Sequence, residues 1–184
     1  GFSENVIVSS GGGDNMMAAI GTGNVAPGVV TTSLGTSGTI YCFSEKPVVD
    51  PEGELAAFCS SDGHWLPLVC TMNVTVSTEL TRSLFGLNIE ELNAEIAASR
   101  PGANGLILLP YFNGERTPAL PSAKANLYGM DSTNYNRSNV CRAAMEGATF
   151  GLRYGLDVFK RQGITPAEIR LIGGGSKSGI WRQM

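Results

Sequence analysis

Three glycine-rich turns contain the residues best suited to bind phosphate or transfer a proton. They are Gly-Gly-Gly-Asp-Asn at 11–15, Gly-Thr-Ser-Gly at 35–38 and Gly-Gly-Gly-Ser-Lys-Ser at 173–178. Glycine permits positive φ and lets backbone N–H groups approach an anion without a Cβ in the way, as in many phosphate sites. The first and third turns also precede expected helices, whose N-termini favour negative charge. One such turn is most often a plain connection, but three with Ser or Thr alongside favour a shared nucleotide site.

Asp14, in the first turn, has two interpretations. As an N-cap, its carboxylate would accept a hydrogen bond from a backbone N–H at the start of a helix, which stabilises by about 1 kcal/mol. As a general base, it would take the proton of a substrate hydroxyl that attacks a phosphoryl group. Local sequence favours the cap, and the two roles are compatible because a helix N-terminus keeps a carboxylate ionised.

The other polar candidates are weaker. Residues 115–118 (Glu-Arg-Thr-Pro) fit a solvated turn and a lid over a substrate equally well. His64 lies in an expected hairpin turn and is expected to have no catalytic part. Four large side chains follow the buried faces of expected elements and are assigned to the core, as are the helix aromatics: Met16, Met17, Trp65 and Trp181.

Two familiar nucleotide-binding motifs fail here. The pattern GxxxxGK[ST] does not occur, and the GxGxxA match at 21–26 follows an expected helix rather than a strand. The four cysteines lack CxxC spacing and there is one histidine, so we expect no metal site and no disulfides. Reduced, buried cysteines in a cytoplasmic protein fit this pattern best.

Composition limits the class of protein. The 184 residues include 24 glycines, about 13% against a usual share of about 7%, and 42% are apolar, enough for the core of one domain. Charged residues reach only 16%, the net charge is −3, and Lys and Arg form no basic run. We therefore expect no nucleic-acid or membrane partner. No apolar stretch approaches the roughly 18 residues that span a bilayer, and residues 1–10 have neither the basic nor the apolar region of a signal peptide, so we expect a soluble, unexported protein.

The hydrophobic pattern predicts a mixed α/β sheet with helices packed on its faces. Strands are expected at 5–9, 29–34, 39–43, 55–60, 64–69, 105–109 and 169–172. Helices are expected at 14–20, 73–85, 89–98 and 138–162, the last capped by Ser138, with a long irregular loop at 113–136. A last helix is expected to begin near Lys177 and to be still running at Met184, so the chain looks cut short.

Five segments together make the sequence recognisable. They are 9–23 (SSGGGDNMMAAIGTG), 31–43 (TTSLGTSGTIYCF), 109–118 (LPYFNGERTP), 125–146 and 171–184 (LIGGGSKSGIWRQM). In this order they resemble the C-terminal half of the FGGY family of carbohydrate kinases, and its xylulose-kinase branch most closely. The resemblance extends over nearly the whole chain, which makes it far more specific than any one turn.

The resemblance implies an actin-like, ribonuclease-H-like ATPase domain, with a mixed sheet and helices on both faces. ATP, with Mg²⁺ bridging its phosphate oxygens, would lie between two such domains, and the N-terminal one would bind most of the sugar. Asp14 would be the catalytic base. The resemblance places two sets of residues around the nucleotide. Those at the phosphates would be Gly35, Thr36, Ser37 and Gly38. Those at the adenosine would be Gly174, Gly175, Ser176, Lys177 and Ser178.

The function expected from the resemblance is ATP-dependent phosphorylation of a sugar hydroxyl, D-xylulose to D-xylulose 5-phosphate. Residues 1–184 would form the C-terminal kinase domain, truncated at its C-terminal end, without the N-terminal sugar-binding domain and hence inactive alone. Its partners would be a sugar and ATP, and a homodimer stays open. The alternatives are a kinase for ribulose, gluconate or glycerol, and a non-catalytic actin-like module that only binds nucleotide.

Overall fold

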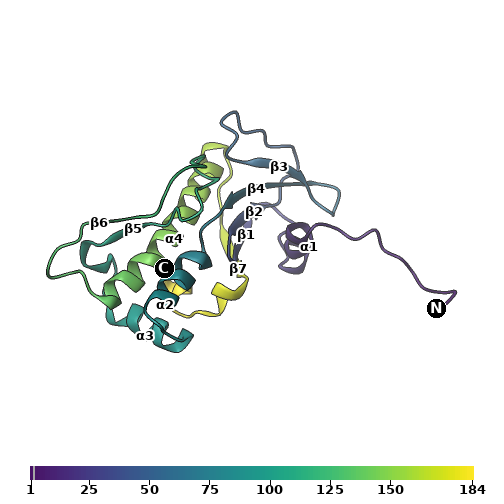
Figure 1. Ribbon diagram of the computed structural model, residues 1–184. Coiled ribbons are helices and arrows are strands. Elements are labelled where there is room, and N and C mark those ends of the chain that lie inside the picture. Colours follow the sequence, from purple (N-terminus) through teal and green to yellow (C-terminus); the bar gives the residue numbers. More distant parts are fainter. Residues whose placement is uncertain (2) are drawn as a thin grey trace.

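A five-stranded mixed sheet forms the centre of the computed structural model, which describes residue 1 and residues 3–184 (Figure 1). The strand order is β3-β4-β2-β1-β7, with β1 and β7 parallel and the other neighbours antiparallel. The strands are β1 (Val29–Leu34), β2 (Gly38–Cys42), β3 (Ala56–Cys59), β4 (Trp65–Thr71) and β7 (Glu168–Ile172). Both expected hairpins and the expected mixed sheet are thereby confirmed.

Helices cover both faces of this sheet, as expected. They are α1 (Asp14–Gly21), α2 (Thr75–Leu84), α3 (Ile89–Ala98) and α4 (Arg137–Arg161). On one face, Ala19 of α1 packs with Tyr41 of β2 and Leu68 of β4. On the other, Leu152 and Phe159 of α4 pack in the main core, and α2 and α3 lie against the outer side of α4 (Figure 1).

Small residues on α4 allow it to approach its neighbours closely, as the sequence indicates. A Cβ at Gly155 would lie 2.8 Å from Ile40 Cδ1, and one at Gly147 would overlap the Leu108 carbonyl oxygen. Gly155 therefore faces the central sheet. Gly147 faces the small second sheet, formed by β5 (Ile107–Leu109) and β6 (Asn126–Tyr128). The strand β6 is missing from the sequence prediction because its three residues pair only with β5 and show no buried face of their own.

The strand expected at 5–9 is wrong. These residues make no strand pairs, and Ile7 and Val8 are 93% and 86% exposed. An apolar run becomes a strand only where a neighbouring strand takes up its backbone hydrogen bonds, and no described residue does so here. Figure 1 shows the segment leading away from α1.

Two helix predictions also need correction. In place of a helix from Lys177 to Met184 there are two short 3₁₀ turns, η2 (Gly174–Lys177) and η3 (Trp181–Gln183). Ser178 between them has extended backbone angles, and the glycines on either side disfavour helix. The cap of α4 is Asn136, whose side chain accepts the Asn139 N–H at 3.0 Å, and the Ser138 hydroxyl donates to Glu95 instead.

Three side chains depart from the expected core. Cys59 is exposed because β3 is an edge strand with all four residues exposed, whereas burial raises the pKa of the Cys42 thiol to about 12. Met17 is 41% exposed and Phe150 60% exposed, while Trp181 is buried as expected.

Among the described residues, no helix is long and apolar enough to cross a membrane.

Candidate nucleotide site

The second and third glycine turns meet at one edge of the sheet. They follow β1 and β7, and because these strands are parallel their carboxyl ends lie side by side. Gly173 has φ +84°, and a Cβ there would lie 2.8 Å from the backbone carbonyl of Leu34, the last residue of β1. Only glycine fits this close approach. The sequence alone contains no signal for the contact, which joins residues 139 positions apart in the chain.

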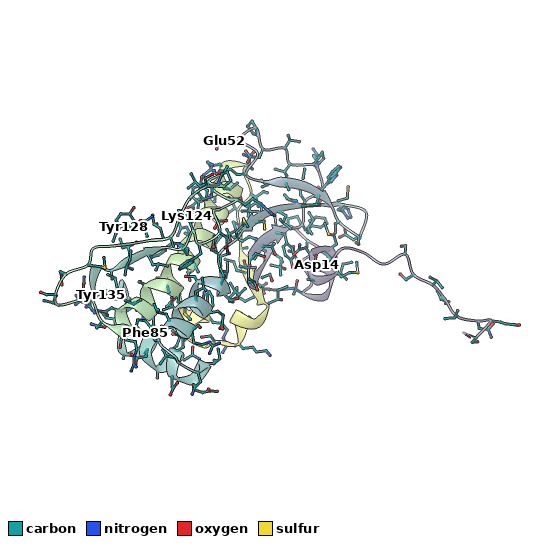
Figure 2. All side chains as sticks on the ribbon, viewed as in Figure 1. Asp14, Glu52, Phe85, Lys124, Tyr128 and Tyr135 are labelled. Carbon is teal, nitrogen blue, oxygen red and sulfur yellow. The ribbon has the colours of Figure 1, made fainter. Side chains whose placement is uncertain are left out.

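The first turn reaches the same edge through a side-chain hydrogen bond. Thr39 Oγ1, near the start of β2, donates to Asn15 Oδ1 at 3.0 Å. Asp14 and Asn15 begin α1, where Figure 2 shows Asp14, so the hydrogen bond to Thr39 brings the start of this helix close to the start of β2. The helix start that carries Asp14 is therefore tied to β2 just after the 35–38 turn, whereas Gly12 lies against Ser61 of the β3–β4 turn.

Asp14 is not the N-cap that local sequence favours. The cap position is Gly13, which makes no side-chain capping bond, and Asp14 is the first helical residue. Its Oδ1 accepts the N–H of Asn15 at 2.8 Å, while Oδ2 has no partner among the described residues, and the side chain is exposed. The carboxylate is held at one oxygen and open to a ligand at the other.

The 35–38 turn is held from behind by the start of α2. The carbonyl oxygens of Gly35 and Thr36 accept the N–H groups of Thr75 (2.9 Å) and Val74 (3.0 Å). A Cβ at Gly38 would lie 2.6 Å from Val74 Cγ2, so glycine is required there. Thr36 and Ser37 are exposed, which leaves their hydroxyls and N–H groups free to meet an anion.

A cavity of about 430 Å³ lies beside the third turn, between η2, α2 and α3. Gly174, Gly175, Lys177 and Ser178 contribute to its lining, as the resemblance implies. Ser176 does not, because its hydroxyl turns back and donates to the Gly173 carbonyl at 2.7 Å. The remaining lining comes from Thr75, Thr78, Glu79, Ile89, Leu92, Asn93, Met145 and Trp181.

The cavity is apolar with a few polar groups, the usual character of a site for a flat aromatic base. The α3 residues Ile89, Leu92 and Asn93 were absent from the sequence-based site, because an amphipathic helix carries no motif for ligand contact. Ser178 Oγ donates to Asn93 Oδ1 at 3.2 Å, which ties α3 to the turn after β7.

The 115–118 loop is anchored by a buried carboxylate. Glu115 is only 4% exposed and accepts hydrogen bonds from Met72 N (2.6 Å), Asn73 Nδ2 (3.0 Å) and Arg116 N (2.8 Å). Thr117 is 1% exposed, and only Arg116 of these three faces solvent. The loop is therefore neither a solvated turn nor a hinged lid, but a fixed support for the end of β4.

Replacing Glu115 by glutamine should lower the free energy of unfolding by about 2 kcal/mol, because a buried, charged acceptor of three N–H groups becomes a neutral one. Urea denaturation measures the change. Glu45→Gln, at an exposed position, should stay within about 0.5 kcal/mol of the original chain. Equal stability of the two variants would contradict the anchoring role.

Metal-ligand geometry is absent from the described part of the chain, where no three His, Cys, Asp or Glu side chains are grouped to hold an ion. The open oxygen of Asp14 is a candidate contact for a cation that arrives with a ligand.

Comparison with known proteins agrees with this geometry. Residues 30–184 match the model of the FGGY family of carbohydrate kinases, C-terminal domain. The chain is 58% identical over its full length to a xylulose kinase of Haemophilus influenzae, of which it spans 37%. A crystal structure of a xylulose kinase from Bifidobacterium adolescentis aligns with 94% of the chain and 34% of that protein, with a TM-score of 0.85 and 44% identity.

A glycerol kinase from Plasmodium falciparum, solved with ADP, shares the fold at 22% identity, with a TM-score of 0.82 over 92% of this chain and 35% of that one. The chain thus spans little more than a third of the relatives that it matches. These sugar kinases have the actin-like ATPase fold, and the mixed sheet with helices on both faces is its counterpart here. The chain belongs to the FGGY family of carbohydrate kinases, and its residues 30–184 correspond to the C-terminal domain of that family.

Proposed function

We propose that the complete protein transfers the γ-phosphoryl group of ATP to a primary hydroxyl of D-xylulose, giving D-xylulose 5-phosphate. The observation that carries this proposal is the meeting of the second and third glycine turns at one sheet edge beside a base-sized cavity, with the residue next to Asp14 bonded to β2 at that edge. The similarity to xylulose kinases supports the choice of sugar.

In the proposed complex, adenosine occupies the cavity beside Gly174 and Gly175, between α2 and α3. The phosphates then extend along the 35–38 turn, whose exposed Thr36 and Ser37 offer hydrogen-bond donors. This path ends at the N-terminus of α1, where the helix dipole and free N–H groups favour the negative γ-phosphate. Mg²⁺, when bound to the ATP phosphates, would neutralise part of their charge.

Asp14 would act as the general base at the end of this path. Its open oxygen takes the proton of the sugar hydroxyl while that oxygen forms a bond to the γ-phosphorus. The bond from the γ-phosphorus to the bridging oxygen breaks at the same time, and ADP leaves with the electron pair. The hydrogen bond from the Asn15 N–H to the other carboxylate oxygen orients the base before transfer.

The proposal assigns residues 1–184 to a C-terminal domain that binds nucleotide and carries the base, with most sugar contacts supplied by an N-terminal domain. The chain alone would then bind nucleotide without turnover. Because the donor is ATP, we place the reaction in the cytoplasm, within xylose metabolism.

A panel of sugars and polyols tests the proposed function. The complete kinase should phosphorylate D-xylulose with a kcat/KM at least about tenfold above those for ribulose, gluconate and glycerol, measured by coupled ADP release. Mass spectrometry of the product should show one added phosphate. Preference for another substrate would reassign the sugar, and nucleotide binding without any transfer would favour the non-catalytic module.

A further inference from the structure

Arg116 is an exposed cation to which the mechanism proposed above gives no role. Its guanidinium Nη1 donates to Cys70 Sγ at 3.4 Å. Within residues 1 and 3–184, no carboxylate lies within 4 Å of this guanidinium to neutralise it. Thus a charged group with free donors is held against the end of β4.

A short series of contacts connects Arg116 with the helix that carries Asp14. Cys70 of β4 is the register partner of Thr39 of β2, so their side chains lie on the same face of the sheet. Thr39 in turn donates to Asn15, next to Asp14. Cys70 also packs in the cluster formed by α1 and the sheet, which places the Arg116 guanidinium on the α1 face.

The order of strands decides which part of the nucleotide Arg116 could meet. Along the sheet edge, the adenosine cavity lies at the end of β7, the 35–38 turn joins β1 to β2, and Arg116 lies at β4 beyond β2. A nucleotide with its base in the cavity and its phosphates along the turn directs the γ-phosphate toward β2 and β4. Arg116 is therefore at the acceptor end, far from the base.

Arginine is well suited to such a place, because its planar guanidinium can donate two parallel hydrogen bonds to phosphoryl oxygens. We propose that Arg116 is a catalytic residue that binds the γ-phosphoryl group during transfer and stabilises its negative charge. The proposal rests on the proposed function, since it needs a nucleotide in the same orientation.

Arg116 can be tested apart from the stability of its loop, because the anchoring groups belong to Glu115 and Thr117. The Glu115 carboxylate holds the Arg116 backbone N–H, which every substitution except proline retains. Truncating the exposed Arg116 side chain therefore removes the guanidinium and leaves the buried supports in place.

In the complete kinase, Arg116→Ala should lower kcat by about 10³-fold, the effect of removing an arginine from a phosphoryl-transfer site. KM for the sugar and Kd for ADP should stay within about threefold, because neither ligand carries the transferring group. Arg116→Lys should recover only part of kcat, since an ammonium lacks the paired donors. Added guanidinium at low millimolar concentration should raise kcat of Arg116→Ala about tenfold and leave the original enzyme unchanged.

The matched control is Arg153→Ala, which removes an exposed arginine of α4 paired with Asp157 and should leave all these values unchanged. Any one of three results would overturn the proposal. They are a kcat for Arg116→Ala within threefold of the original, an effect confined to the sugar KM, and no response to guanidinium. Binding of ADP with aluminium fluoride, a mimic of the transferring group, gives a readout that needs no sugar, and Arg116→Ala should weaken it at least about tenfold.

These outcomes separate the inference from the proposed function. A complete kinase that phosphorylates sugar equally well with and without Arg116 defeats only the role of Arg116. A protein that transfers phosphate to no sugar defeats the proposed function. In that case, equal binding of the ADP and aluminium fluoride complex by the original chain and Arg116→Ala would also defeat the arginine contact.

Discussion

Replacing Asp14 by asparagine in the complete kinase is expected to lower kcat by about 10³-fold, the scale of losing a general base. The amide cannot take the proton of the sugar hydroxyl, but it has the size of the carboxylate. Its oxygen can still accept the N–H of Asn15, so the start of α1 should keep its geometry. The affinity for ADP should remain within about threefold, because Asp14 does not line the cavity proposed for adenosine.

Coupled ADP release measures kcat of the Asp14→Asn variant, and calorimetric titration measures its affinity for ADP. Asp157→Asn is the matched control, because Asp157 is a surface carboxylate of α4 that pairs with Arg153 and Lys160. It should have the kcat of the original kinase. Retention of more than about a tenth of kcat in Asp14→Asn would eliminate the base assignment and leave Asp14 as a residue that only supports the helix.

Leucine substitutions at two adjacent glycines of the third turn should affect different properties, ADP binding at Gly174 and stability at Gly175. At Gly174, a Cβ meets no atom within 4 Å and the position lines the cavity, so a leucine side chain has room to fill the adenosine space. Gly174→Leu should weaken ADP binding at least about tenfold, which is about 1.4 kcal/mol, without lowering Tm.

At Gly175, a Cβ would lie 2.8 Å from Leu34 Cβ and 3.1 Å from the Trp181 ring. Gly175→Leu should therefore overpack the junction of β1 and η2 and destabilise the fold by about 3 kcal/mol. Thermal unfolding and ADP titration of both variants separate the two effects. Gly179→Leu, at an exposed glycine outside the cavity lining, should change neither quantity. If Gly174→Leu binds ADP normally, the cavity is not the adenosine site.

Local sequence patterns were enough to predict the elements that form through interactions between residues close together in the chain. The β1–β2 hairpin follows from two runs of β-branched and aromatic residues around a Gly-Thr-Ser-Gly turn, and α4 follows from apolar and small residues at three- and four-residue spacing. The elements predicted wrongly depend on distant partners or on single backbone angles. Residues 5–9 have strand composition but no neighbour, and residues after Lys177 have helical composition interrupted by an extended Ser178.

The candidate site also has a part that could be predicted from the sequence and a part that could not. Local sequence was enough to identify residues that could bind phosphate and accept a proton, because glycine turns and an aspartate at a helix start have those properties wherever they lie. Three features became visible only in the folded chain: Gly173 touches Leu34, Asn15 bonds to Thr39, and Glu115 is buried while Arg116 is exposed. The physical reason is that strand pairing and close packing join residues far apart in the chain, and no local pattern records which distant partner each one meets.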